Sequence, residues 1–109
     1  MASDPKLVAR LGVILAERSD IEQREMFGGV AYLLNGNMCV GVHKHWLIVR
    51  AGERAAAPLL ERADVRPMDI TGKPMKGWIM VGPDGLKRKP DLLRYVDAAL
   101  RFVEGLPAK

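Results

Sequence analysis

The chain has one cysteine, Cys39, and no apolar run long enough to cross a bilayer. A single thiol excludes an internal disulfide framework and is typical of proteins in a reducing compartment. A membrane-spanning helix needs about 20 consecutive apolar residues. Residues 1–4 are polar and precede an amphipathic pattern, so we also expect no signal peptide. These absences favour a cytoplasmic protein that does not associate with a membrane.

The sequence also lacks the motifs of common enzymes. It has no phosphate-binding loop, and its acidic candidates are single and scattered: Asp69, Asp84 and Asp91. Cys39, His43 and His45 form C-x3-H-x-H, but a zinc site needs a fuller set of ligands at fixed geometry. Cys39 and His43 lie too far apart along one extended strand for a direct hydrogen bond. We therefore expect no catalytic residue, no metal and no cofactor, with Cys39 as a buried apolar residue.

Charge is modest and unevenly distributed. The 109 residues carry a net charge of +4 and 49% hydrophobic residues, which is typical of one globular domain spanning residues 1–109. One segment holds five cations and a single acid, and the cations are Lys73, Lys76, Lys87, Arg88 and Lys89. It is either a nucleic-acid footprint or a solvated loop before a helix. No aromatic residue adjoins Lys87–Lys89, so we expect nucleic-acid binding there to be weak.

An antiparallel meander is predicted over Met26–Arg50. Asn35-Gly36 is typical of a type I′ turn, and strands are expected over 30–34, 37–42 and 46–49. Alternation places Met38, Val40 and Val42 on one face, and Cys39, Gly41 and His43 on the other. Neither set is strongly polar, so we expect helices on one face and a loop or a partner on the other.

Two glycines precede the meander in the motif Met26-Phe27-Gly28-Gly29. The motif is either a ligand-cradling loop or a bend in a strand with Phe27 in the core, and the bend is the simpler interpretation. Residues 24–27 then form a further short strand, and residues 21–25 a charged link.

Helix signals flank the meander. Asp4-Pro5 is typical of an N-cap followed by a first helical residue, and Gly105 with Pro107 is typical of a helix end. We predict helices over 4–20, 53–62 and 90–104, an irregular loop over 66–77 and a strand over 78–81. The fold class is therefore α+β: an antiparallel β-meander with packed N-terminal, middle and C-terminal helices.

The predicted loop is unusually apolar. Met68, Met75 and Trp78 either cover the sheet as core residues or present a binding surface, because methionine and tryptophan are both common at adaptable interfaces. Lys73 and Lys76 would then form a polar rim. We predict a partner-binding site from these five residues.

Several motifs together resemble the N-terminal domain of the TfoX/Sxy family. They are Met26-Phe27-Gly28-Gly29, Asn35-Gly36-Asn37-Met38, Pro67-Met68, Pro74-Met75 and Gly77-Trp78. The resemblance spans nearly the whole chain and implies an α+β fold similar to secretion chaperones, in a cytoplasmic bacterial protein. The best-known members regulate natural competence alongside a transcription activator, and there this domain precedes a helical C-terminal domain. The family supplies no established catalytic residues.

These observations together predict a non-enzymatic, cytoplasmic binding or regulatory domain. A protein partner, either a different protein or a second copy of the chain, is favoured by the methionine- and tryptophan-containing loop and the modest charge. The alternative is weak nucleic-acid binding through residues 73–89. A small enzyme that uses Cys39 and His43 is the least favoured alternative.

Overall fold

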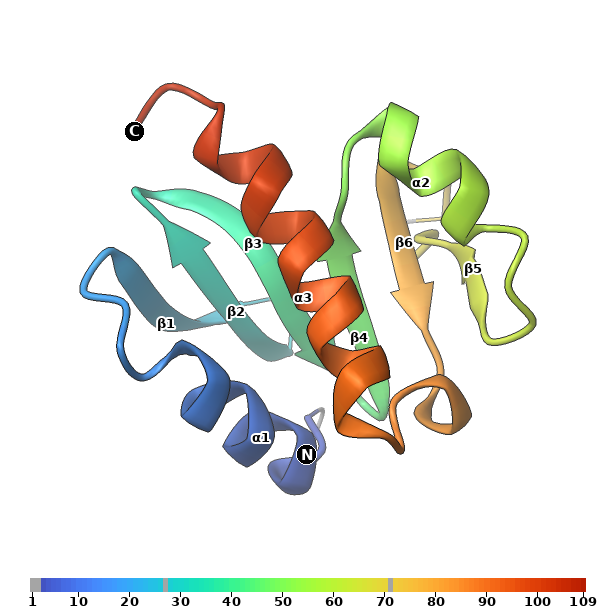
Figure 1. Ribbon diagram of the computed structural model, residues 1–109, viewed down its shortest axis with the longest axis horizontal. Coiled ribbons are helices and arrows are strands. Elements are labelled where there is room, and N and C mark those ends of the chain that lie inside the picture. Colours follow the sequence, from blue (N-terminus) through green and yellow to red (C-terminus); the bar gives the residue numbers. More distant parts are fainter. Residues whose placement is uncertain (1–2, 27, 71) are drawn as a thin grey trace.

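A computed structural model describes residues 3–26, 28–70 and 72–109 (Figure 1). The described chain forms a sheet and three α-helices in the order α1 (Pro5–Leu15), β1 (Ile21–Met26), β2 (Gly29–Leu34), β3 (Asn37–His43), β4 (Trp46–Arg50), α2 (Glu53–Leu59), β5 (Val65–Pro67), β6 (Trp78–Val81), the 3-10 turn η1 (Pro83–Gly85) and α3 (Lys89–Glu104).

The sheet has six strands in the order β1-β2-β3-β4-β6-β5, and all neighbours are antiparallel. The α+β class and the meander are therefore confirmed. Two strands, β1 and β5, differ from the prediction. β1 includes the stretch expected to be a charged link, and β5 begins the stretch expected to be a loop. Both are edge strands, where charged side chains and a proline such as Pro67 are tolerated because one side of the strand is unpaired.

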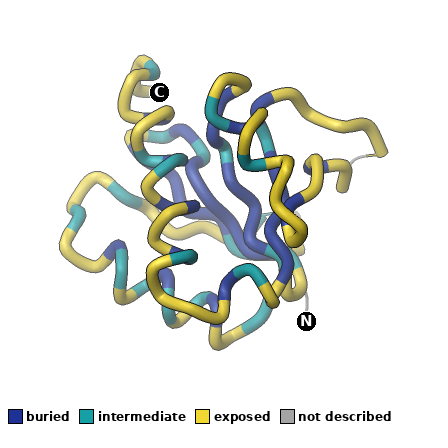
Figure 2. The backbone as a smooth tube through the Cα atoms, turned by 45° about the vertical axis from the view of Figure 1, so that its right-hand side comes forward, coloured by how far each residue is buried: buried dark blue, intermediate teal, exposed yellow. Residues whose placement is uncertain are grey.

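All three helices pack on one face of the sheet, with α3 crossing its middle strands (Figures 1 and 2). The main core lies between these layers. α3 contributes Leu92, Tyr95, Val96, Ala99 and Val103, which recur at helical spacing and are all buried. The buried strands lie beneath helices whose outer sides are exposed (Figure 2).

The start of α1 follows the predicted capping chemistry. Asp4 Oδ1 accepts a hydrogen bond from the Lys6 backbone N–H at 2.9 Å, and Pro5 is the first helical residue. Asp4 Oδ2 also lies 3.0 Å from His45 Nδ1, which ties this helix start to the β3–β4 turn. The helix ends at Leu15, earlier than the predicted end near Ser19-Asp20.

A β-bulge in β3 overturns the predicted division of its side chains between the two faces. Tyr32 pairs with Val40, whereas the next residue, Leu33, pairs with Met38, so Cys39 is the extra residue. Val40 joins the core beneath the helices, and Cys39 lies there too, while Met38 packs on the opposite face. The prediction that Met38 shares a face with Val40 is therefore wrong, because strict alternation fails at a bulge.

The β2–β3 turn has the predicted backbone. Asn35 has a φ of 52° and Gly36 a φ of 85°, the positive values that a type I′ turn requires. The C-terminal tail packs against this turn, where the Lys109 backbone N–H donates to Asn35 O at 2.9 Å. The buried Asn37 side chain donates through Nδ2 to Pro107 O at 2.8 Å. The turn therefore also anchors the tail.

Replacing Gly36 by Val is expected to lower the free energy of unfolding by about 1–3 kcal/mol, because a β-branched residue is strained at positive φ. A Cβ at this position would also lie 2.8 Å from Lys109 Cβ. Gly12→Ala is the matched control, since Gly12 lies within α1 and an added Cβ meets no atom within 4 Å. That variant should gain about 0.5–1 kcal/mol. Urea unfolding measures both, and an unchanged midpoint for Gly36→Val would contradict the turn assignment.

Candidate binding site on the helix-free face

The sheet face opposite the helices carries a second apolar cluster. Alternation along β4 and β6 sends Ile48 and Met80 to this face, while their neighbours enter the main core. Ile48, Met80 and Met68 form the buried centre, with three partly buried residues packed around them: Met38, Trp46 and Trp78. In the described chain this face is covered by the segment after β5 and by no helix.

That segment is held in place by backbone hydrogen bonds. The Met68 N–H donates to Trp78 O at 3.3 Å, the Met75 N–H to Met68 O at 3.1 Å, and the Trp78 N–H to Met75 O at 3.1 Å. Gly77 O accepts from the backbone N–H groups of Ala51 and Gly52 at 2.9 and 3.0 Å. The three apolar residues predicted from the sequence are thus brought together and fastened to the end of β4.

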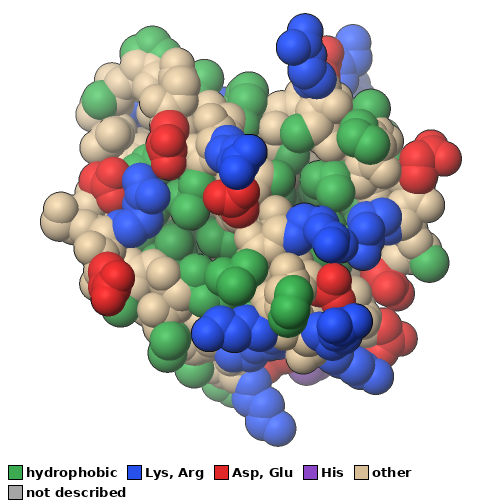
Figure 3. Space-filling view, viewed as in Figure 1, with side chains coloured by type: hydrophobic (Ala, Val, Ile, Leu, Met, Phe, Trp, Pro, Cys, Tyr) green, Lys and Arg blue, Asp and Glu red, His purple; other side chains and the backbone are tan. Residues whose placement is uncertain are grey.

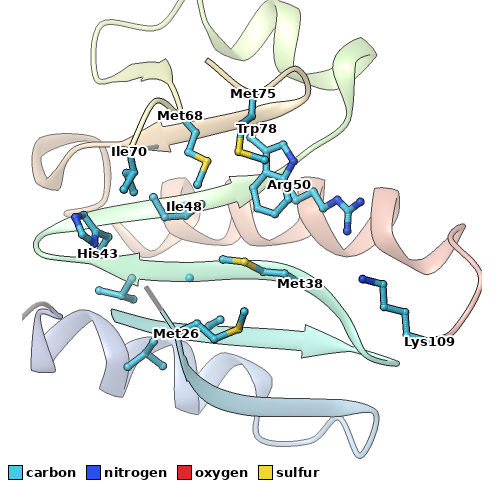
Figure 4. A pocket seen from close by; sticks show the side chains of 14 residues that line it. Met26, Met38, His43, Ile48, Arg50, Met68, Ile70, Met75, Trp78 and Lys109 are labelled. Carbon is cyan, nitrogen blue, oxygen red and sulfur yellow. The ribbon is translucent and has the colours of Figure 1, made fainter. Parts of the chain in front are cut away.

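A cavity of about 400 Å³ lies between this segment and the sheet (Figure 4). Its walls are mostly apolar, and they consist of Met26, Val30, Ala31, Met38, Gly41, Val42, Ile48, Met68, Ile70, Met75 and Trp78. Three further lining residues carry nitrogen groups. Figure 4 shows Arg50 and Lys109 toward one end of the cavity and His43 toward the other.

The predicted site residues fall into two groups. Met68, Met75 and Trp78 line the cavity, and their exposure differs: Met68 is buried at 7%, whereas Met75 is 37% exposed. Lys73 and Lys76 are exposed on the same segment but do not line the cavity. The segment therefore both covers the sheet and presents a surface. The interpretation as core describes Met68, and the interpretation as a binding surface describes Met75.

The residues at the charged end of the cavity are not among those predicted from the sequence. Arg50 could have been found from the alternation of β4, which places it on the same face as Ile48. Lys109 had no local signal, because the contact between the tail and the β2–β3 turn brings it there. His43 was considered only together with Cys39, and Met38 was assigned to the wrong face.

Aromatic rings hold the Arg50 guanidinium. Its Cζ lies 5.2 Å from the centroid of the Trp78 ring and 5.8 Å from that of Phe102. Such contacts orient a cation without neutralising it. Arg50 forms no ion pair with any described residue, and no acidic residue is among those that line the cavity. This end of the cavity therefore favours a negatively charged group.

His43 presents an unsatisfied polar atom. Its Nδ1 is buried and has no hydrogen-bond partner in the described part of the chain. Buried polar atoms in proteins are nearly always paired, so the His43 Nδ1 is an exception to the usual pattern. His45, by contrast, is exposed and paired with Asp4.

The C-x3-H-x-H residues are not assembled into one site. The bulge turns Cys39 into the core beneath the helices, His43 lines the cavity on the opposite face, and His45 lies in the turn beyond. The prediction that Cys39 and His43 share a strand face is therefore wrong. Over residues 3–26, 28–70 and 72–109, no group of three or more His, Cys, Asp or Glu side chains is placed to hold a metal ion.

The Met26-Phe27-Gly28-Gly29 motif lies where β1 ends and β2 begins. A Cβ on Gly29 would overlap Val42 O, so this glycine permits the close approach of β2 and β3. Met26 lines the cavity. Phe27 lies outside the described residues, and so does the prediction that it enters the core.

The comparisons with known proteins identify one family. A model described as the TfoX N-terminal domain matches residues 13–103, which is most of the chain. No curated protein and no solved structure matches. None of the helices in the described part of the chain is long and apolar enough to span a membrane.

The Cys39 thiol is expected to be unreactive in the folded protein. Burial raises its pKa to about 12, and the thiolate is the reactive form. Reaction with a maleimide at neutral pH should be at least about a hundredfold slower in native protein than in the same protein unfolded in urea. A native thiol that reacts as fast as the unfolded one would contradict the buried position of Cys39.

Proposed function

The chain belongs to the TfoX N-terminal domain family, and we propose that it is a non-enzymatic binding or regulatory domain with a protein partner. The partner, either a different protein or a second copy of the chain, binds the helix-free face at Met68, Met75 and Trp78. One observation carries this proposal: an apolar cavity opens on the sheet face that no helix of the described chain covers.

The exposed part of this face has the composition of an interface. Ile70 and Met75 are each 37% exposed beside the cavity, and Lys73 and Lys76 flank them. Interfaces commonly combine an apolar centre with a polar rim, and methionine side chains adapt to the shape of a partner. Clustered exposed apolar residues of this kind commonly mark interaction sites.

Charge placement supports a protein partner over a nucleic acid. The basic segment is divided by β6, whose last three residues are buried. Lys73 and Lys76 precede this strand and Lys87–Lys89 follow it, so the two groups are separated by about 13 Å of strand. Lys87 Nζ also pairs with Asp84 Oδ1 at 3.2 Å. On the helix-covered face, basic side chains gather toward the lower edge of the view, and acidic side chains lie beside them (Figure 3).

The remaining parts of the proposal come from two sources. The separation of Cys39 and His43 on opposite sheet faces supports a non-enzymatic role, because the candidate nucleophile and its candidate base do not lie beside each other. Family membership suggests the regulatory role, as an accessory to transcription regulation in the cytoplasm like the TfoX/Sxy competence regulators.

Met75→Asp is expected to abolish partner binding while the fold is kept. A buried charge in an interface should weaken binding by at least about tenfold, whereas in the free protein the loss of the partly buried Met75 side chain should cost about 1–2 kcal/mol of stability. Sedimentation velocity measures self-association. Capture from nuclease-treated bacterial lysate, followed by mass spectrometry, measures binding of a different protein.

Leu93→Asp is the matched control. Leu93 is 39% exposed, close to the 37% of Met75, but lies on α3 on the other side of the sheet. This variant should keep the self-association or capture of the parent protein. The proposal fails if the parent shows neither, or if Met75→Asp keeps what the parent shows. A large loss of thermal stability in a monomeric Met75→Asp protein would identify Met75 as a core residue instead.

A further inference from the structure

We propose that the cavity binds a small molecule with an apolar body and a carboxylate, and that the carboxylate lies at the Arg50 end. This inference rests on the proposed function only in taking the helix-free face as a binding surface. It adds a ligand to that face and specifies the chemistry of the ligand.

The walls favour an apolar body of moderate size. A volume of about 400 Å³ is within the usual range for small-molecule sites. Four of the lining residues are methionines: Met26, Met38, Met68 and Met75. Their unbranched, polarizable side chains can change rotamer to follow an alkyl or aromatic group. Ile48 and Trp78 supply the stiffer parts of the wall.

The charged end favours a carboxylate. The Arg50 guanidinium is planar and can donate two parallel hydrogen bonds to a carboxylate. The rings of Trp78 and Phe102 orient it and leave its charge unpaired with any described acid. The Lys109 side chain lies toward the same end of the cavity (Figure 4). A cationic ligand would meet repulsion from the Arg50 charge, and an uncharged one would lack the ion pair that a carboxylate forms with it.

His43 lines the opposite end of the cavity (Figure 4). His43 Nδ1 is a buried polar atom without a partner among the described residues, and it belongs to a lining residue. His43 therefore serves as a probe of occupancy at the far end of the cavity.

Ligand binding should also affect the partner surface. Met68, Met75 and Trp78 are both cavity wall and part of the proposed interface. If a ligand orders this segment, it changes partner affinity, and the partner changes ligand affinity by the same factor. The cavity would then be the regulatory input of the domain.

Three probes with the same tail test the carboxylate: decanoate and decyltrimethylammonium, each titrated below its micelle concentration, and decanol, titrated below its solubility limit. Calorimetry should show saturable binding of decanoate and at least about tenfold weaker binding of the other two. Spectra of methyl-labelled methionine locate the site. The Met26, Met38, Met68 and Met75 signals should shift, whereas Met80 should move least because it does not line the cavity. The imidazole signals of His43 should shift, and those of His45 should not.

Charge variants test the role of Arg50. Arg50→Gln should weaken decanoate binding by about tenfold, and Arg50→Lys should give an intermediate loss, because the charge is kept but the two parallel hydrogen bonds are not. Lys6→Gln is the control for general surface charge, since Lys6 is exposed on α1 and does not line the cavity. The inference is overturned if decanoate does not bind, if decanol binds equally well, or if Lys6→Gln weakens binding as much as Arg50→Gln.

The two proposals can fail separately. Titration with decanoate needs no protein partner, and the comparison of Met75→Asp with Leu93→Asp needs no ligand. If decanoate does not bind and Met75→Asp loses its partner, only the ligand proposal fails. If decanoate binds specifically and Met75→Asp still binds its partner, only the interface proposal fails.

Discussion

The architecture depends on one constraint: the sheet is apolar on both faces, and its three described helices pack on only one. β4 shows why this matters, because Leu47 and Val49 enter the main core while Ile48 faces the other way. That second face must be shielded from water by something other than a helix. The segment that begins at Met68 does so, and because it is short and irregular it leaves a cavity instead of a filled core. The candidate site is thus a consequence of how the sheet is covered.

Two backbone features determine where the cavity lies. The bulge at Cys39 turns Met38 out of the main core and onto the cavity wall, where alternation alone would not have placed it. The hydrogen bonds from Ala51 and Gly52 to Gly77 O fasten the covering segment to the end of β4. The bulge places Met38 on the cavity wall, and the hydrogen bonds position the segment that covers the cavity. Both are backbone arrangements, so the side chains of the segment remain available for contacts with a partner or a ligand.

The charge of Arg50 connects the two proposals. Contacts with the rings of Trp78 and Phe102 give the Arg50 guanidinium a defined position without an acidic partner. An ion pair with a carboxylate of the chain would have oriented it equally well but would have satisfied its charge. A domain of the TfoX N-terminal family with such a cation at the end of an apolar cavity is suited to sense an anionic ligand. It could report that ligand to a protein bound on the same face.

The sequence by itself determined the features that depend on neighbouring residues. Asn35-Gly36 specified its turn and Asp4-Pro5 its helix start, because positive φ and N-capping are local properties. The apolar segment from Met68 to Trp78 was also recognisable as a candidate surface. Only the tertiary structure decided the full extent of the edge strand β1, the face of Met38, and the meeting of Arg50 and Lys109 at one end of the cavity. Each of these depends on pairing register or on contacts between residues distant in the chain, and composition and periodicity do not record either.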